Sequence, residues 1–367
     1  MVDILIFPQF ESFGGAKTYF YHLLKYCIQK KYIVCVILNS YQLDSSLTTF
    51  LNTQSIKYII IPGWFIKLRK LFAKFSEILI IILEIFYAFI YWHRFKPKRI
   101  LISATKPGQL FGLFLIPTKI IYILHTYPTK NLTIYQNLLL KYKKAKVNLI
   151  TVSDFSRNQI CKYIPIAKEN VVAFPPFVNN YQCQKPNKTT GQINILTCGH
   201  VIWYKQPDLW LNIALKIVSK YENVNFTWVG SGPDIQKIKN AIPLNYVKRI
   251  NFVGMKVDLS PFYCKADIYF QPSLIESFGM SVAEAMSASL PVLATDVGAL
   301  SEVIDQEKTG YLVKNNDQEN LIQKLELLIN DPKLRQRLGA LGSVKFEKQY
   351  NFKNWVNKMD QSLKLKP

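Results

Sequence analysis

The stretch "PSLIESFGMSVAEAMSASLPVLATDVGALSEVI", residues 272–304, decides the fold. A strand end meets a turn at Phe278 and Gly279, a helical pattern follows, and the apolar run "PVLATD" comes next. This succession is typical of a βαβ unit with parallel strands. A glycine at such a turn lets backbone N–H groups approach an anion, and the helix N-terminus adds a partial positive charge. The stretch therefore predicts a parallel sheet with a diphosphate site at this turn.

Two acids flank the turn in a chain that is otherwise strongly basic. Glu276 comes just before the predicted helix, and Glu284 lies about two turns inside it. The two carboxylates would then reach different parts of one extended ligand. Because carboxylates accept hydrogen bonds from hydroxyl groups, as they do from ribose in dinucleotide sites, sugar hydroxyls are the expected targets. The alternative interpretation is an exposed pair of acids on a helix.

The same alternation of short apolar runs and helical patterns extends over the whole chain, and 367 residues suit two domains. The polar stretch from 179 to 192 interrupts the alternation and predicts a linker. We expect two doubly wound α/β domains at 1–180 and 191–345, followed by a C-terminal helical segment, 346–367, that packs on the second domain or crosses back to the first. The expected strands are "DILIF", "YIVCVIL", "KYIII", "RILIS", "KIIYIL" and "NLITVS" in the first domain, and "INILTCG", "NFTWVGSG", "RINFVG", "ADIYFQPS", "PVLATD" and "GYLV" in the second.

The net charge of +22 is concentrated in the first half. Residues 1–180 hold 23 basic and 7 acidic side chains, a net charge of +16, and the remainder carries +6. This imbalance predicts an anionic partner for the first domain: a phospholipid surface, a phosphorylated acceptor or nucleic acid. The lysine-rich run "KYKKAK", 141–146, is either part of that surface or a solvated face.

One segment, residues 78–92, is apolar except for Glu84. Its fifteen residues fall short of the roughly 20 that span a bilayer, and a central carboxylate would be costly there. Lys70, Lys74, Glu77 and Glu84 lie on a polar stripe, which suits a helix buried against the sheet or a helix lying in the membrane interface. A membrane span is the third and least favoured interpretation.

The six cysteines show no C-x-x-C pair and no histidine at metal-ligand spacing, so we expect reduced, mostly buried thiols. The first residues lack a charged leader and read as a short strand running into a glycine turn. The prediction is a cytoplasmic protein, associated peripherally with the inner face of the membrane if the basic domain binds lipid.

Residues 272–304 resemble the E-x7-E signature of retaining glycosyltransferases of the family 4 type, glycosyl transferases group 1. Other motifs of that family follow in its order along nearly the whole chain: "FGGAKTY", "HTYP", "VSDFSRNQI", "VVAFPPFV", "CGHVIWYKQPD", "WVGSGPD" and "INFVGMK". The resemblance implies the GT-B architecture, in which two Rossmann-like domains face each other across a cleft. It also implies transfer of a sugar from a nucleotide-diphosphate donor to an acceptor hydroxyl, with retention at the anomeric carbon.

By this resemblance the donor is bound mainly by the second domain. Glu284 would bind the ribose hydroxyls, and Glu276 would contact the donor sugar. The backbone at Phe278 and Gly279 would hold sugar and diphosphate, while Lys205 would neutralise the phosphate charge that grows as the glycosidic bond breaks.

The first domain would complete the site when the domains close. Gly14 and Gly15 resemble the family's glycine-rich first loop, and His125 its histidine on the acceptor side. His200 stands where the family usually has an arginine, which implies either a weaker, pH-dependent phosphate contact or none. The implied catalytic residues are His125, Lys205 and Glu276.

The family's reaction needs no metal, and the sequence has no Asp-x-Asp site to hold one, so we expect no cofactor. The implied partners are a nucleotide-sugar and a lipid-linked or otherwise anionic acceptor, in cell-envelope or extracellular polysaccharide or glycolipid synthesis. Three alternatives remain: an epimerase or phosphorylase of the same fold, a degenerate non-catalytic member, and a basic nucleic-acid binder. The last is disfavoured because no compact recognition motif is present.

Overall fold

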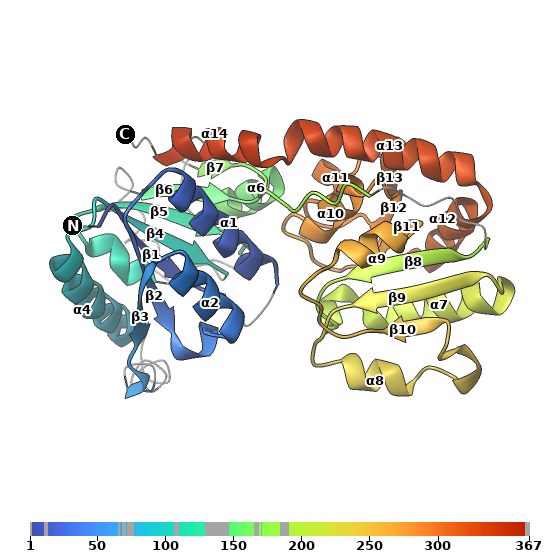
Figure 1. The fold of residues 1–367 in the computed structure, drawn as a ribbon, viewed down its shortest axis with the longest axis horizontal. Coiled ribbons are helices and arrows are strands. Elements are labelled where there is room, and N and C mark those ends of the chain that lie inside the picture. The colour runs from blue at the N-terminus through green and yellow to red at the C-terminus, as the bar shows by residue number, and fades with distance from the viewer. Residues whose placement is uncertain are drawn as a thin grey trace. The chain divides into compact units, whose positions relative to one another are not determined.

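The computed structural model of the protein divides into two compact units (Figure 1). The first unit comprises Met1–Pro175 together with Trp355–Pro367, and the second comprises Pro176–Asn354. The structure describes residues 2–10, 14–64, 67, 71, 77–105, 110–128, 147–164, 169, 171–183 and 191–363. Two predictions fall on residues outside these ranges. They are the anion-binding role of the lysine run at 141–146 and the place of the lysines at 70 and 74 on the polar stripe.

The first unit is built on a parallel sheet of seven strands in the order β3-β2-β1-β4-β5-β6-β7. Its central strands are buried over nearly their whole length, as expected of a sheet that is covered on both faces. All six strands predicted for this half are confirmed, and a short seventh joins them. The strands are β1 (Ile4–Pro8), β2 (Val34–Asn39), β3 (Lys57–Ile61), β4 (Arg99–Ala104), β5 (Lys119–Leu124), β6 (Val147–Thr151) and β7 (Val171–Ala173).

Helices cover both faces of this sheet. α1 (Gly15–Gln29) and α2 (Ser45–Thr53) lie in front of it in Figure 1. The opposite face packs against α4 (Glu77–Phe95) and α6 (Asp154–Tyr163), which share one apolar core with β1, β4 and β5. The short helices η1 (Ser40–Gln42) and η2 (Phe111–Leu115) complete the unit.

The last helix of the chain, α14 (Phe352–Leu363), joins the first unit. The Trp355 ring packs edge-on against Tyr19 and Tyr26 of α1, with ring centroids 5.8 and 5.6 Å away. Asp360 accepts hydrogen bonds from the Tyr26 hydroxyl at 2.7 Å and from the Lys30 ammonium at 2.6 Å. The aromatic contacts and this charged network attach the C-terminal segment to α1.

The second unit repeats the plan with six parallel strands in the order β10-β9-β8-β11-β12-β13. The strands are β8 (Ile193–Cys198), β9 (Val224–Val229), β10 (Ile250–Phe252), β11 (Ile268–Gln271), β12 (Val292–Thr295) and β13 (Gly310–Val313). The helices are η4 (Trp203–Lys205), α7 (Pro207–Lys220), α8 (Ile235–Asn240), η5 (Leu244–Tyr246), α9 (Ser260–Lys265), α10 (Met280–Ser287), α11 (Leu300–Val303), α12 (Gln318–Asn330) and α13 (Pro332–Gln349). All six predicted strands are confirmed.

Both sheets have the strand order of a Rossmann-like domain, which confirms the predicted fold class. In each, the order reverses between the first strand and the fourth: between β1 and β4, and between β8 and β11. Ligands of open parallel sheets bind outside the carboxyl ends of the strands at such a reversal. This rule directs attention to the loops that follow β8 and β11.

The apolar segment at 78–92 forms most of α4. Tyr87, Ala88 and Tyr91 pack into the core, and Glu84, which the sequence placed on a polar stripe, is buried on this same side. The opposite side of α4 is exposed and apolar. No helix within the described ranges combines the length and the apolar character needed to cross a membrane.

Candidate functional site

The loops after β8 and β11 lie side by side at the strand reversal of the second unit. β8 and β11 are parallel neighbours in the sheet, and the backbone N–H of Leu274 donates to the carbonyl of Tyr204 at 2.7 Å. This bond joins the loop before α10 to the turn η4. It brings together two segments that are about 70 residues apart in sequence.

An ion pair connects these two loops. Lys205, the last residue of η4, donates through its ammonium group to Oε1 of Glu276. The two side chains are only 13% and 9% exposed. Such a pair is costly to desolvate, and removing one partner leaves an uncompensated buried charge. The pair therefore holds a cation and a carboxylate at fixed positions at the carboxyl edge of the sheet.

A chain of hydrogen bonds among buried hydroxyl and amide groups also holds the Glu276 carboxylate. Oε1 accepts from the Ser273 hydroxyl at 3.0 Å and from the Gln271 side-chain amide at 3.3 Å. The amide oxygen of Gln271 in turn accepts from the Tyr269 hydroxyl at 2.7 Å. Because every group in this chain of hydrogen bonds is paired and buried, the carboxylate has little freedom to rotate.

Two glycines let the backbone close tightly around this loop. Gly298 has a φ of +59°, and a Cβ there would lie 1.9 Å from the Glu276 carbonyl oxygen. Gly279 has a φ of +95° and is the N-cap of α10. Both positions require conformations that other residues rarely adopt. The amino end of α10 thus lies directly after Glu276, as the sequence predicted.

Glu284, in the second turn of α10, is 6% exposed. Its carboxylate accepts from the Tyr263 hydroxyl at 3.0 Å and from the Asn179 side-chain amide at 3.3 Å. Burial raises its pKa to about 7, although both hydrogen bonds act in the opposite direction. The predicted pair Glu276 and Glu284 is therefore buried and hydrogen-bonded, and the alternative of two exposed helix acids is wrong.

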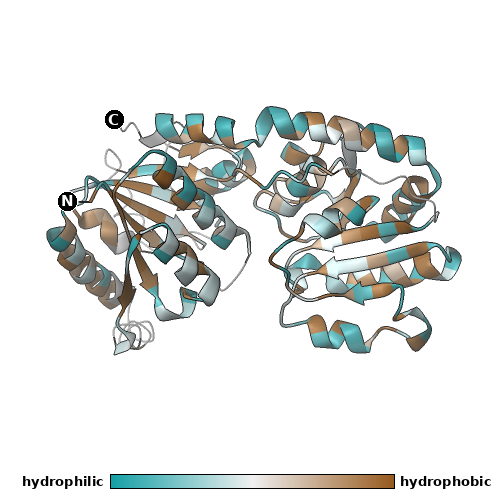
Figure 2. Cartoon of the chain, in the orientation of Figure 1, coloured by the Kyte–Doolittle hydropathy of each residue, from teal (hydrophilic) through white to brown (hydrophobic). Residues whose placement is uncertain are grey.

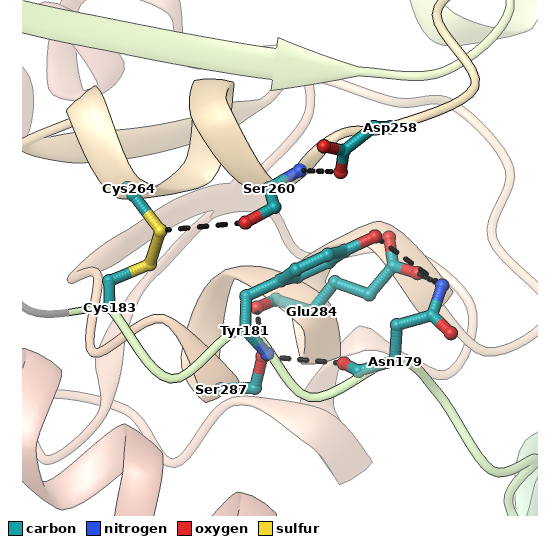
Figure 3. Close-up of a disulfide and its surroundings, with 8 residues drawn as sticks. All are labelled: Asn179, Tyr181, Cys183, Asp258, Ser260, Cys264, Glu284 and Ser287. Atoms are coloured by element: carbon teal, nitrogen blue, oxygen red, sulfur yellow. Dashed lines mark hydrogen bonds between the residues drawn. A yellow bond between two sulfur atoms is a disulfide. The ribbon is translucent and has the colours of Figure 1, made fainter.

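The linker segment after β7 covers Glu284 (Figure 3). The Tyr181 ring stacks on Tyr263 with centroids 4.8 Å apart, and its backbone N–H donates to the Ser287 hydroxyl at 2.9 Å. Two residues later, Cys183 forms a disulfide with Cys264 of α9. This segment thus belongs to the second unit and is joined to it both by hydrogen bonds and covalently.

The disulfide corrects the expectation that all thiols are reduced. Cys183 and Cys264 are 81 positions apart, so no sequence pattern indicated their pairing. Their Cα atoms come within 5.1 Å only because the linker packs against α9. The other four cysteines are not in disulfides: Cys27, Cys35 and Cys198 are buried and Cys161 is half-buried.

Two other predicted donor residues lie in the same loops. His200 is half-buried between β8 and η4. The Phe278 side chain is buried against Tyr350, with ring centroids 5.4 Å apart, so its ring packs in the unit and only its backbone remains for a ligand.

The remaining predicted residues, Gly14, Gly15 and His125, belong to the first unit. Gly14 is the N-cap of α1 with a φ of +108°, and Gly15 is the first residue of that helix. His125 follows β5, where its Nε2 lies 2.7 Å from the Ser103 hydroxyl and its ring packs edge-on against Tyr19. Burial lowers the pKa of His125 to about 4, so the imidazole is neutral at physiological pH.

The structure thus brings Lys205, Glu276, Gly279 and the helix α10 together in the second unit. It also reveals supporting residues that the sequence did not indicate: Asn179, Tyr181, Tyr263, Gln271 and Ser273. Gln271 and Ser273 could have been found, since they end the strand that leads to Glu276. The other three come from distant segments and carry no local signal. Within the described residues, no cluster of three or more His, Cys, Asp or Glu side chains could hold a metal ion.

Residues 180–343 match the family Glycosyl transferases group 1. The matched region contains Lys205, Glu276 and Glu284 and covers most of the second unit. The architecture of two Rossmann-like units is the GT-B fold that the resemblance implied.

Similar proteins agree with this match. An uncharacterized glycosyltransferase from Haemophilus influenzae is 32% identical over 182 residues, which are 49% of this chain and 48% of that protein. The chain therefore aligns with about half the length of this relative. The phosphatidylinositol N-acetylglucosaminyltransferase GPI3 subunit of Saccharomyces cerevisiae is 26% identical over 345 residues, 88% of this chain and 73% of that protein. Among solved structures, Anabaena HepE in complex with UDP and glucose has a TM-score of 0.77 at 15% identity, covering 99% of this chain and 100% of HepE.

Proposed function

We propose that the protein is a retaining glycosyltransferase that moves a sugar from a nucleotide-diphosphate donor to an acceptor hydroxyl. The observation that carries this proposal is the buried pair of Lys205 and Glu276, with Glu284 behind it, at the strand reversal of the second unit. This constellation lies in the region that matches the glycosyltransferase family. The UDP and glucose bound by HepE support a nucleotide-sugar as the donor.

Each part of the donor would have its own contact in the second unit. The ribose hydroxyls donate to Glu284, which is already surrounded by groups that fix its position. The diphosphate lies at the amino end of α10, where the Phe278 and Gly279 backbone and the helix dipole favour an anion. The sugar lies against Glu276, and His200 stands beside the phosphates.

The transfer step places a growing negative charge on the departing nucleoside diphosphate. Lys205 stabilises that charge, because its ammonium group is held at the mouth of the site by Glu276. The bond from the anomeric carbon to the phosphate oxygen breaks while the acceptor oxygen attacks from the same face. The acceptor's proton passes to the leaving phosphate oxygen. Glu276 positions the sugar and is not a nucleophile in this scheme, and no metal takes part.

The acceptor would bind the first unit, where Gly14, Gly15 and His125 lie. Since His125 is neutral, it can accept a hydrogen bond from an acceptor hydroxyl or orient it. The charge of +16 over residues 1–180 favours a lipid-linked or otherwise anionic acceptor over a neutral one, and the yeast relative acts on phosphatidylinositol by its name. We place the protein in cell-envelope polysaccharide or glycolipid synthesis, on the cytoplasmic face of the membrane.

The proposal is tested by thermal shift with a panel of UDP-, GDP-, ADP- and TDP-sugars, on the wild type and on Glu284→Ala. One donor should stabilise the wild type and fail to stabilise the variant. Glu319→Ala, an exposed position on α12, is the matched control and should respond as the wild type does. A folded wild type that no donor stabilises would instead favour a degenerate, non-catalytic member. Release of nucleoside diphosphate that needs no acceptor would favour an epimerase or a related enzyme.

A further inference from the structure

The outer side of α4 exposes a row of large apolar side chains to solvent. Ile82, Phe86 and Ile90 are 55%, 63% and 47% exposed, and they follow one another at intervals of four residues. Phe89 and Leu79 flank the row. Residues at this spacing lie on one side of a helix, so they form a continuous apolar strip, which we call the α4 strip. Figure 2 shows α4, at the left, largely in hydrophobic colours.

A continuous strip of this kind differs from the isolated apolar residues that are common on protein surfaces. The inner side of α4 already fills the core through Tyr87, Ala88 and Tyr91. The fold of the first unit therefore does not need the strip. From Leu79 to Ile90 it extends for about 16 Å, which suits a helix lying in a membrane interface and is too short for a span.

A cationic cavity of about 630 Å³ adjoins the carboxyl end of α4. Its lining includes His93, Lys96, Lys98, Arg99 and Lys119, and none of the described residues that line it is acidic. Arg99 and Lys119 are the first residues of β4 and β5, so the cavity lies at the amino ends of these strands. His125 and Gly14 follow the carboxyl ends of their strands, at the other edge of the sheet.

Two of these cationic groups show how the cavity is prepared for an anion. The Nε–H of Arg99 is buried and has no hydrogen-bond acceptor within the described residues. A phosphate oxygen would supply that acceptor and offset the cost of burying the guanidinium group. Lys98 is partly satisfied, because its ammonium group contacts Asp3 at 2.8 Å. Lys96 and Lys119 are exposed at the rim.

The strip and the cavity are continuous. Phe89 of the strip contacts Trp92, which lines the cavity, with ring centroids 5.3 Å apart. His93 follows Phe89 by four positions and so continues the same side of the helix into the cavity. Apolar side chains beside a cluster of cations are the combination with which interfacial helices bind anionic bilayers.

We propose that the first unit docks on an anionic bilayer, inserting the α4 strip among the acyl chains and binding a phospholipid headgroup in the cationic cavity. This inference rests on the proposed function, since a lipid-linked acceptor requires the enzyme at the membrane. The docking itself is measured without donor or acceptor. A failure of docking is thus distinguished from a failure of the donor panel.

The test is flotation of the full-length protein with vesicles of phosphatidylcholine alone or of equal parts phosphatidylcholine and phosphatidylglycerol. The wild type should float only with the anionic vesicles. Phe86→Glu, and separately the pair Lys96→Glu and Lys119→Glu, should each weaken binding by about tenfold or more. Each variant has a matched control at exposed positions of the second unit, and these controls should bind as the wild type does. Val344→Glu is the control for the strip, and the pair Lys237→Glu and Lys239→Glu is the control for the cavity.

Phe86→Lys separates insertion from simple charge attraction, because it adds a cation while it removes an apolar side chain. Weaker binding than that of the wild type supports insertion of the strip. Equal or stronger binding overturns it. The proposal also fails if the wild type does not float with the anionic vesicles, or if an oligonucleotide binds as tightly and is lost with the same variants. Unchanged thermal midpoints establish that the variants fold.

Discussion

The first six strands of the first sheet have the same order as the six strands of the second, but the carboxyl edges of the two sheets carry different chemistry. The edge of the second sheet carries two buried hydrogen-bonded groups. In one, the Glu276 carboxylate is paired with Lys205 and Ser273; in the other, the Glu284 carboxylate accepts from Tyr263 and Asn179. At the edge of the first sheet a neutral histidine packs against a tyrosine. In the proposed function, the edge of the second sheet would bind the diphosphate donor and the edge with the neutral histidine would bind the acceptor hydroxyl. The side chains on the loops, and not the sheets, decide what each unit does.

The largest effect on activity is expected from Lys205, the buried cation at the edge of the second sheet. Replacing it by glutamine removes the cation that would stabilise the leaving diphosphate, so sugar transfer should fall by about 100- to 1,000-fold. Lys237→Gln, which removes an exposed ion pair with Asp208 in the same unit, should leave the rate unchanged. The measurement is initial rate at saturating donor, with the thermal midpoint as the check on folding. A folded Lys205→Gln variant of normal activity would remove Lys205 from the mechanism.

The disulfide should matter for the second unit alone. Opening the link by Cys183→Ser frees a segment that is closed over 81 positions, and the loss of such a bridge typically lowers the free energy of unfolding by about 2–4 kcal/mol. Donor affinity should fall as well, because Asn179 and Tyr181 lie just before the cysteine. Denaturant titration and donor titration measure the two effects. Cys264→Ser should match Cys183→Ser, whereas Cys161→Ser in the first unit should lose no donor affinity.

Glu284 gives the second unit a pH-dependent stability. Its folded pKa of about 7 lies above the 4.5 of an exposed glutamate, so the folded protein binds this proton more tightly than the unfolded chain. The stabilisation is complete below about pH 4.5 and is lost as the pH rises through 7. Unfolding measured across this range should show the wild type losing about 3 kcal/mol relative to Glu284→Gln. A constant difference between the two proteins would mean that Glu284 does not titrate in this way.

The smallest effect is expected at the first unit. His125→Asn removes one hydrogen-bonding ring at the acceptor side, so transfer should fall by about tenfold while the donor-induced thermal shift is unchanged. Activity assays and donor panels on the same preparation test both parts. Loss of the donor-induced thermal shift in this variant would contradict the proposal that the second unit binds the donor and the first unit the acceptor.

The sequence predicted the large features of the fold because they follow from local patterns. All twelve strands that were expected formed, and the tail "DPKLRQRLGALGSVKFEKQYNFKNWVNKM" forms α13 and α14. Alternating apolar runs and helical periods suffice for this, since a parallel sheet buries its strands on both faces.

The site was predicted only in part. The spacing of Glu276 and Glu284 around a glycine turn indicated a ligand site, and only the family resemblance added Lys205 to it. The sequence did not reveal that Glu276 is paired with Lys205, or that Glu284 is covered by the linker. It also suggested free thiols where a disulfide forms, and placed Glu84 on a polar stripe when the helix buries it.

The sequence by itself determined which segments are strands and helices, where the glycine turns fall, and which acids stand beside them, because these depend on neighbours within a few positions. Only the tertiary structure decided that Asn179 reaches Glu284 across 105 positions, that Cys183 meets Cys264 across 81, and that Arg99 and Lys119 line one cavity. The physical reason is that such contacts are fixed by how strands pair and how loops pack at the edge of a sheet. No local pattern encodes them.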